Sequence, residues 1–108
     1  VNLAGAQLHR INFRKANLTG ATLADAQLQG ANLTGARCWG TNFTAAHLTG
    51  ACLKERKIKN ATILKDIDCQ YVYLEEGLII DGYRDRRPCN QDDLFQPGDF
   101  EHFFQGQG

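Results

Sequence analysis

The amino-acid sequence repeats its hydrophobic pattern every five residues over its first 65 positions. Every fifth residue from position 3 is apolar, through thirteen consecutive units. With 43% hydrophobic residues in the chain, a run of this length would arise by chance with a probability of about 10⁻⁵, so the period is a structural signal. These positions, which we expect to form the structural core, are Leu3, Leu8, Phe13, Leu18, Leu23, Leu28, Leu33, Cys38, Phe43, Leu48, Leu53, Ile58 and Ile63.

Small residues and glycines keep the same five-residue phase. Alanine fills nine of the thirteen positions that lie two residues before a core residue. Residues two apart on an extended chain point to one face, so the alanine and the core residue face inward together. Glycine stands two residues after the core residue in six units, where it accepts the positive φ of a sharp turn. Each unit is therefore a short extended piece followed by a turn, and the pattern predicts an all-β solenoid.

Two segments, Ala16–Gly20 and Ala31–Gly35, both read A-N-L-T-G. This pattern and its close variants resemble the pentapeptide-repeat family over residues 1–65. The resemblance implies a right-handed quadrilateral β-helix with four units in each coil, and hence about three to four coils in this chain. Adjacent coils are expected to stack at the spacing of β-strands, about 4.8 Å.

The five-residue phase fails after the thirteenth unit, where it would place an aspartate in the core. One inserted residue restores it and brings Ile67 and Cys69, then Val72 and Leu74, to the inside. We interpret this break as a bulge near residues 64–66. The solenoid is then expected to span residues 1–74.

Residues 75–108 are predicted to form a C-terminal cap within the same structural domain. An open last coil would expose unpaired backbone and apolar side chains, so a solenoid needs such a cover. The sequence predicts a strand with a turn over 77–83, a loop over 85–98 and a short amphipathic α-helix near 97–105. Phe100, Phe103 and Phe104 share one face of that helix and are expected to cover the last coil.

The formal net charge is zero, but the two parts of the chain carry opposite charges. Residues 1–65 hold nine basic and two acidic side chains, a net +7, whereas residues 66–108 hold three basic and ten acidic ones, a net −7. This distribution excludes a uniformly basic nucleic-acid binder and a uniformly acidic mimic of nucleic acid. Nucleic acid is therefore not an expected partner.

Basic residues of the solenoid form the candidate binding surface. With four units per coil, Arg37 and Lys57 stack on one side with Trp39 beside them, and Arg14 and Lys54 stack on the neighbouring side. Such a face fits an acidic partner protein, and it equally fits a solvated charged surface that keeps a β-solenoid from aggregating.

The sequence carries no motif of a catalytic, metal or cofactor site. No two of the four cysteines form a C-x-x-C pair, so a zinc motif has no support, and we expect free thiols in a reducing, cytoplasmic compartment. The three histidines are expected to be solvated. No apolar run reaches the roughly 18 residues of a membrane span.

The preferred functional hypothesis is therefore a non-enzymatic module that binds another protein. One alternative is an appendage of a larger regulatory or catalytic protein, because the chain starts inside a repeat at Val1. The same start allows a monomer or an end-to-end homodimer through the first coil. Some members of the family mimic DNA and inhibit DNA gyrase, but that role requires an acidic rod, which the +7 of residues 1–65 contradicts.

Overall fold

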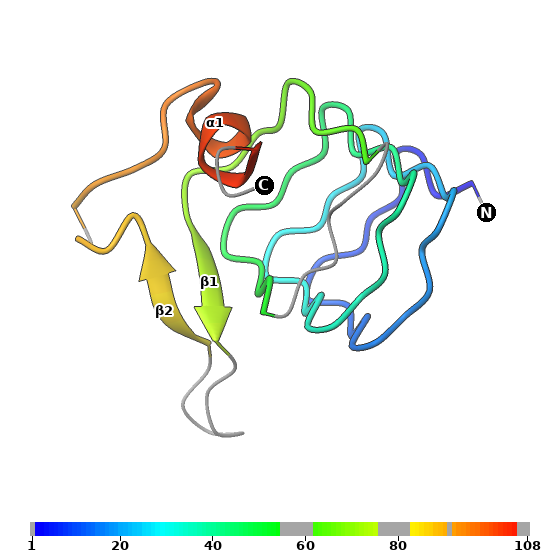
Figure 1. The fold of residues 1–108 in the computed structure, drawn as a ribbon, viewed down its shortest axis with the longest axis horizontal. Coiled ribbons are helices and arrows are strands. Elements are labelled where there is room, and N and C mark those ends of the chain that lie inside the picture. The colour runs from blue at the N-terminus through cyan, green and yellow to red at the C-terminus, as the bar shows by residue number, and fades with distance from the viewer. Residues whose placement is uncertain (1, 55–61, 76–82, 91, 106–108) are drawn as a thin grey trace.

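The computed structural model describes residues 2–54, 62–75, 83–90 and 92–105, apart from the side chains of residues 103 and 105. It contains strand β1 (Val72–Glu75), strand β2 (Arg84–Arg87) and helix α1 (Asp99–Gln105). Residues 2–54 wind through stacked coils, and β1, β2 and α1 lie at the end of the stack remote from the N-terminus (Figure 1).

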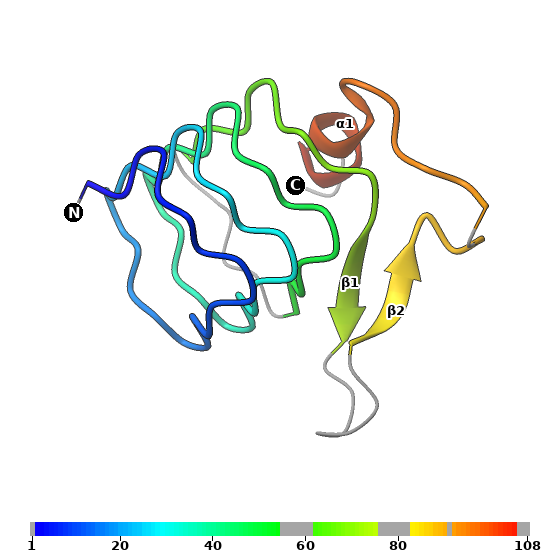
Figure 2. The same cartoon turned by 180° about the vertical axis from the view of Figure 1, so that it is seen from behind.

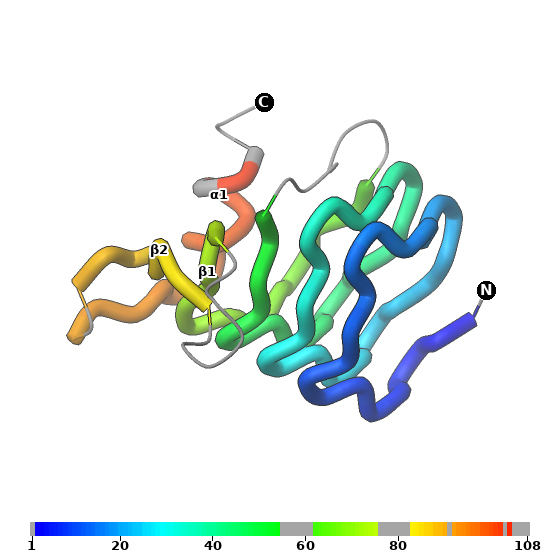
Figure 3. The backbone as a smooth tube through the Cα atoms, turned by 90° about the horizontal axis from the view of Figure 1, so that it is seen from below, coloured from blue at the N-terminus to red at the C-terminus, as the bar shows by residue number. Residues whose placement is uncertain are grey.

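Parallel β-bridges join equivalent positions of the repeat in successive coils. The first four connect Asn2 with Thr22, Gln7 with Gln27, Asn12 with Asn32 and Asn17 with Arg37. Each bridge spans four five-residue units, so each unit lies beside its equivalent in the next coil, as the stacked tube shows (Figure 3). We name the four rows of equivalent units side 1 (2–5, 21–25, 41–45, 62–66), side 2 (6–10, 26–30, 46–50, 67–71), side 3 (11–15, 31–35, 51–54, 72–75) and side 4 (16–20, 36–40).

Each unit ends in a turn that one backbone hydrogen bond closes. In a typical unit, the Ala21 N–H donates to the Leu18 carbonyl at 2.9 Å. The third residue of every such turn from position 5 to position 50 has a positive φ, as a type II turn requires. Glycine fills six of these ten positions, and Arg10, Lys15, Asp25 and Ala45 fill the others. A non-glycine residue in this conformation costs about 1–2 kcal/mol, so the fold imposes the turn even where the sequence opposes it.

The interior is filled by large and small apolar side chains in alternating rows. Eight of the expected core residues are buried: Leu18, Leu23, Leu28, Leu33, Cys38, Phe43, Leu48 and Leu53. Three others, Leu3, Leu8 and Phe13, are partly buried and pack against them, and Ile58 lies outside the described residues. The alanine positions from Ala21 to Ala51 are buried as well, so the two inward rows together leave little free space.

Threonine replaces alanine in the small row of side 1 without leaving a polar group unpaired. Thr41 is fully buried, and its hydroxyl donates to the Leu18 carbonyl at 2.6 Å. Thr62, at the equivalent position of the next coil, donates its hydroxyl to the Cys38 carbonyl in the same way. Because a buried hydroxyl is costly without a partner, these bonds are what permits threonine in this row.

The spacing between coils lengthens by one residue before Ile63. The bridge between Asn32 and Cys52 keeps the regular spacing of four units, whereas the next, between Asn42 and Ile63, is one residue longer. A shift of one residue moves each side chain to the opposite face of an extended chain. Ile63 consequently points outward and is 44% exposed, and Leu64, 8% exposed, takes the core position.

Two sequence-based expectations are therefore wrong at this point. Ile63 is not a core residue, and the inserted residue does not lie at 64–66, because Asp66 occupies a regular turn position with a φ of 55°. Ile67, Cys69 and Val72 are buried, as the restored phase predicted, and Leu74 is partly buried and packs against the core.

Strand β1 continues side 3 and ends its row of parallel units. Tyr73 of β1 bridges Cys52 in parallel and faces Arg86 of the antiparallel strand β2; the two strands lie side by side in both views (Figure 2). The expected loop over 85–98 therefore begins with a strand. The arginines and the aspartate of β2 do not indicate a strand in the sequence, because the strand forms by pairing with β1 rather than through intrinsic propensity. Of the strand expected over 77–83, residues 77–82 lie outside the described residues.

Helix α1 starts two residues later than the sequence predicts. Gly98 has a φ of +89°, which no α-helix accommodates, so the helix begins at Asp99, whose Oδ2 accepts a hydrogen bond from the Gln96 N–H at 2.8 Å. Phe100 and Phe104 are 1% and 8% exposed and belong to the same buried cluster as the solenoid leucines. The side chain of Phe103 lies outside the described part of the structure.

Substitution of Leu28 by aspartate tests the register of the repeat. Leu28 is fully buried in the second coil, so Leu28→Asp places an unpaired charge in the core and should destabilise the chain by more than about 3 kcal/mol. Asn12→Asp is the matched control, because the Asn12 Oδ1 already accepts the Arg14 N–H on the exposed face. Chemical denaturation of both variants measures the difference, and equal stabilities would contradict the register.

Reciprocal substitutions at two turns test the cost of positive φ. A Cβ at Gly40 would meet only the backbone of Gly20, at 3.8 Å or more, so Gly40→Ala should cost about 1 kcal/mol through backbone strain alone. Ala45→Gly, at a φ of 59°, should raise the stability by up to a similar amount. Thermal unfolding checks both signs, and a shift in the same direction for both variants would refute this account.

Candidate functional site

The clearest candidate binding surface in the described chain is on side 4. Arg37 bridges Asn17 of the previous coil, and its side chain is exposed. Trp39, in the following turn, is 41% exposed although it is a large aromatic residue. Tryptophan and arginine are the residue types that most often dominate protein–protein binding energies. We call this pair the Arg37–Trp39 surface; Lys57, expected on the same side, lies outside the described residues.

Arg14 and Lys54, the other two basic residues of the predicted binding surface, lie on side 3, where the surroundings differ from those of the Arg37–Trp39 surface. The Lys54 Nζ forms an ion pair with Glu75 Oε1 at 3.3 Å. Between Arg14 and Lys54, Thr34 is only 3% exposed, and its hydroxyl donates to Asn32 Oδ1 at 2.6 Å. The row on side 3 is thus interrupted by a buried residue, and one of its basic groups is already neutralised.

A histidine–aspartate pair on side 2 was missed by the sequence analysis. His47 Nδ1 lies 2.7 Å from Asp68 Oδ2, because the two residues form a parallel bridge. His47 is therefore paired rather than simply solvated. The lengthening of the spacing by one residue is the signal that could have identified the pair, because it places Asp68 beside His47.

A pocket of about 610 Å³ separates the last described coil from the segment that leads into α1. Residues 66–70 form one wall and residues 94–98, with Glu101, form the other. The Phe95 N–H donates to the Gln70 carbonyl at 2.8 Å and so fixes the two walls relative to each other. The charged residues among those that line the pocket are all acidic: Asp66, Asp68 and Glu101.

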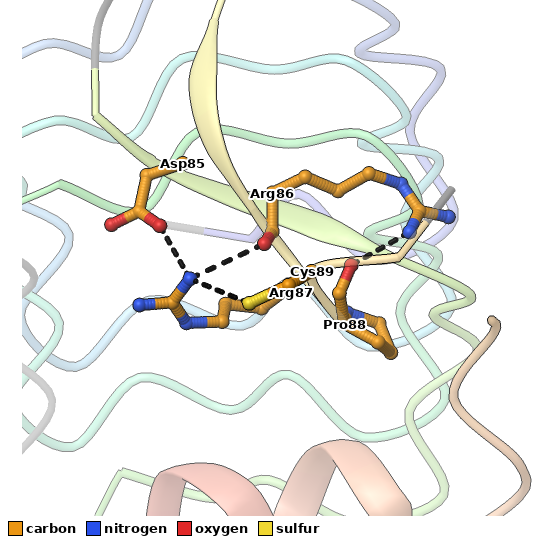
Figure 4. A network of polar contacts seen from close by, with 5 residues as sticks. All are labelled: Asp85, Arg86, Arg87, Pro88 and Cys89. Carbon is orange, nitrogen blue, oxygen red and sulfur yellow. Dashed lines mark hydrogen bonds and ion pairs between the residues drawn. The ribbon is translucent and has the colours of Figure 1, made fainter. Parts of the chain in front are cut away.

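Arginines of β2 hold the loop that follows it. The guanidinium of Arg86 donates to the carbonyls of Pro88, at 2.6 Å, and Asn90, and it lies 4.7 Å from the centre of the Tyr71 ring. The Arg87 guanidinium bonds the Asp85 carboxylate and lies 3.2 Å from the Cys89 sulfur (Figure 4). The N–H donors of Arg86 and Arg87 are directed at groups of their own loop. This indicates that the two side chains have a structural role.

The cysteines are all free in the structure, and three of them are buried. Burial raises the pKa of the Cys38 thiol to about 12. Burial likewise raises the pKa of Cys69, and the charges of Asp68 and Glu101 raise it further. A thiol that stays protonated is a poor nucleophile, so Cys38 and Cys69 act as small core residues.

The described residues offer neither a metal centre nor a membrane-spanning helix. Within them, no group of three histidine, cysteine or acidic side chains is arranged to hold a metal ion. The same part of the chain contains no helix with the length and apolarity that a bilayer crossing requires.

Comparison with known proteins identifies the repeat. The model of the family described as pentapeptide repeats matches eight copies, over residues 1–35 and 23–55. A solved pentapeptide repeat protein from the Arabidopsis thaliana thylakoid lumen is 31% identical, with a TM-score of 0.47. The match covers 74% of this chain and 52% of that protein, so the chain spans about half the length of that structure. Curated proteins gave no significant match.

The family match and the geometry concern the same residues. The matched copies lie within residues 1–55, just over half of the 108 residues, and the parallel bridges connect units of this same stretch. The chain therefore belongs to the pentapeptide repeat family, whose fold is a right-handed β-helix.

Proposed function

We propose that this chain is a non-enzymatic scaffold module that binds another protein through the Arg37–Trp39 surface. The observation that carries the proposal is the exposure of a tryptophan beside an unburied arginine on an otherwise regular solenoid. An exposed aromatic residue with a neighbouring cation supplies both apolar contact area and charge steering toward an acidic partner.

The distribution of side chains supports a binding role over a catalytic one. Inward positions of the coils are occupied by packed apolar groups, so the solenoid offers its outward faces rather than an interior cavity. Pentapeptide repeat proteins are generally non-catalytic scaffolds, and the repeat here follows the same plan. The recognition chemistry is then set by the few outward residues that depart from small polar types.

We also propose the complete architecture as a quadrilateral β-helix of about three to four coils over residues 1–74, covered by a cap over 75–108. Phe100 supports the cap, since it lines a small apolar space together with Leu53 and Leu64. The T-shaped contact of Phe95 with Phe100, at a ring separation of 6.2 Å, extends this apolar cover.

The hypothesis of a DNA mimic is less well supported by the charges. A DNA mimic requires acidic solenoid faces, whereas residues 1–65 carry a net +7. A cytoplasmic location remains a prediction based on the free thiols, and the solved family member comes from a thylakoid lumen.

Affinity capture with matched variants tests the binding surface. The chain is immobilised and exposed to a lysate of the source organism at low and at high salt. A stoichiometric partner should be retained at low salt and released at high salt, because screening weakens contacts to Arg37. The double variant Arg37→Glu, Trp39→Ala should weaken the affinity by more than about tenfold.

Lys65→Glu is the control for that experiment. It makes the same reversal of charge as Arg37→Glu, at an exposed residue of side 1, and should leave the partner bound. Equal loss of binding in the control would indicate non-specific attraction to net positive charge. Full retention by the double variant, or capture of no partner at either salt, would contradict the proposal.

A further inference from the structure

The pocket between residues 66–70 and 94–98 has the size and the walls of a binding site. Its volume of about 610 Å³ is within the roughly 300–1,000 Å³ that is typical of ligand pockets. Ile67, Phe95 and Pro97 contribute apolar walls, and Leu94 belongs to the lining although it is 43% exposed. A ligand that suits this pocket therefore has an apolar portion.

The charge inside the pocket is negative and only partly compensated. Asp68 is paired with His47 at 2.7 Å. Glu101 is different, because its Oε1 atom is buried and has no hydrogen-bond partner among the described residues. Burial of a carboxylate oxygen without a partner is unfavourable. None of the residues that line the pocket is basic, so negative charge predominates on its walls.

The negative charge of Asp68 and Glu101 also acts on a third residue of the pocket, Cys69. Cys69 lies on the wall formed by residues 66–70. After burial, the charges of Asp68 and Glu101 are the causes that raise the pKa of its thiol. Both carboxylates therefore act on the same small volume, which concentrates their attraction for a cation.

Lysine and arginine side chains match this combination of walls and charge. Their aliphatic stems cover apolar surface while the charged group reaches a polar one, and a guanidinium can donate two parallel hydrogen bonds to a carboxylate. A metal ion fits less well, because the described residues contain no convergent set of three ligands.

We propose that this pocket binds a lysine or arginine side chain from a basic segment of a partner protein. The inference rests on the proposed scaffold function and names a second contact for it. The pocket is on sides 1 and 2 together with the segment before α1, whereas the Arg37–Trp39 surface is on side 4, so the two can be tested separately. One module would then hold an acidic and a basic region of its partners at once.

A titration with single-charge peptides tests the proposal on the full chain. The probe is acetyl-Ser-Gly-Arg-Gly-Ser-amide, and its neutral control carries citrulline in place of arginine. Backbone NMR signals of residues 66–70 and 94–98 should shift saturably with the arginine peptide and not with the citrulline peptide. Glu101→Gln should weaken the binding by about five- to tenfold, as expected for loss of a charge-assisted hydrogen bond near the surface.

Asp25→Asn is the matched control, because it removes one negative charge from an exposed turn of side 1 and asparagine tolerates its positive φ. Binding should be unchanged in this variant. Glu101→Gln should also raise the melting temperature of the free protein, since it removes a poorly compensated charge. A lower melting temperature with unchanged binding would show that Glu101 has a structural role only, and would overturn the proposal.

Other occupants give distinguishable results. Tighter binding of putrescine than of the arginine peptide would assign the pocket to free diamines. Concentration-dependent dimers that Glu101→Gln abolishes would assign it to a second copy of the chain. Either result overturns the assignment to a partner segment, whereas failure of this titration alongside capture through Arg37 and Trp39 would leave the scaffold function intact.

Discussion

The backbone hydrogen bonds between equivalent units are the constraint on which the rest of the structure depends. The Leu8 N–H donates to the Gln27 carbonyl at 2.7 Å, and the Gln27 N–H donates to the Ala6 carbonyl at 2.8 Å. Gln27 therefore uses both of its backbone groups on the preceding coil, as do the bridging residues that follow it. Units of equal length keep this pairing regular over residues 2–54, and there they stack leucine on leucine and alanine on alanine.

A large part of the fold could be predicted because its cause is local and repeated. The apolar period and the glycines specify the unit, and the same bonds then recur with each coil. The exceptions depend on context that a period does not contain. Ile63 and Leu64 are adjacent and both apolar, so only the position of the extra residue decides which one is buried. The strand character of Arg84–Arg87 likewise arises from its pairing with β1.

The candidate binding surfaces could likewise be predicted only in part. Counting four units per coil correctly places Arg37 over Asn17, but the count does not reveal that Lys54 is paired with Glu75 or that Thr34 is buried. The pocket was not predicted, because its walls come from two segments that are distant in the sequence and whose approach depends on the chain passing through β1 and β2. Local pattern thus determines which side a residue occupies, and contacts between distant segments determine whether it is available.

The regular spacing of four units per coil also limits how such a molecule can change in length. Insertion of one five-residue unit would rotate all preceding units by a quarter of a coil relative to β1, β2 and α1, and would move Arg37 and Trp39 to a different angular position around the axis. Insertion of four units would restore the original angle and lengthen the stack by one layer, about 4.8 Å. Variation in steps of one whole coil therefore changes the separation of two surfaces while it preserves their relative orientation.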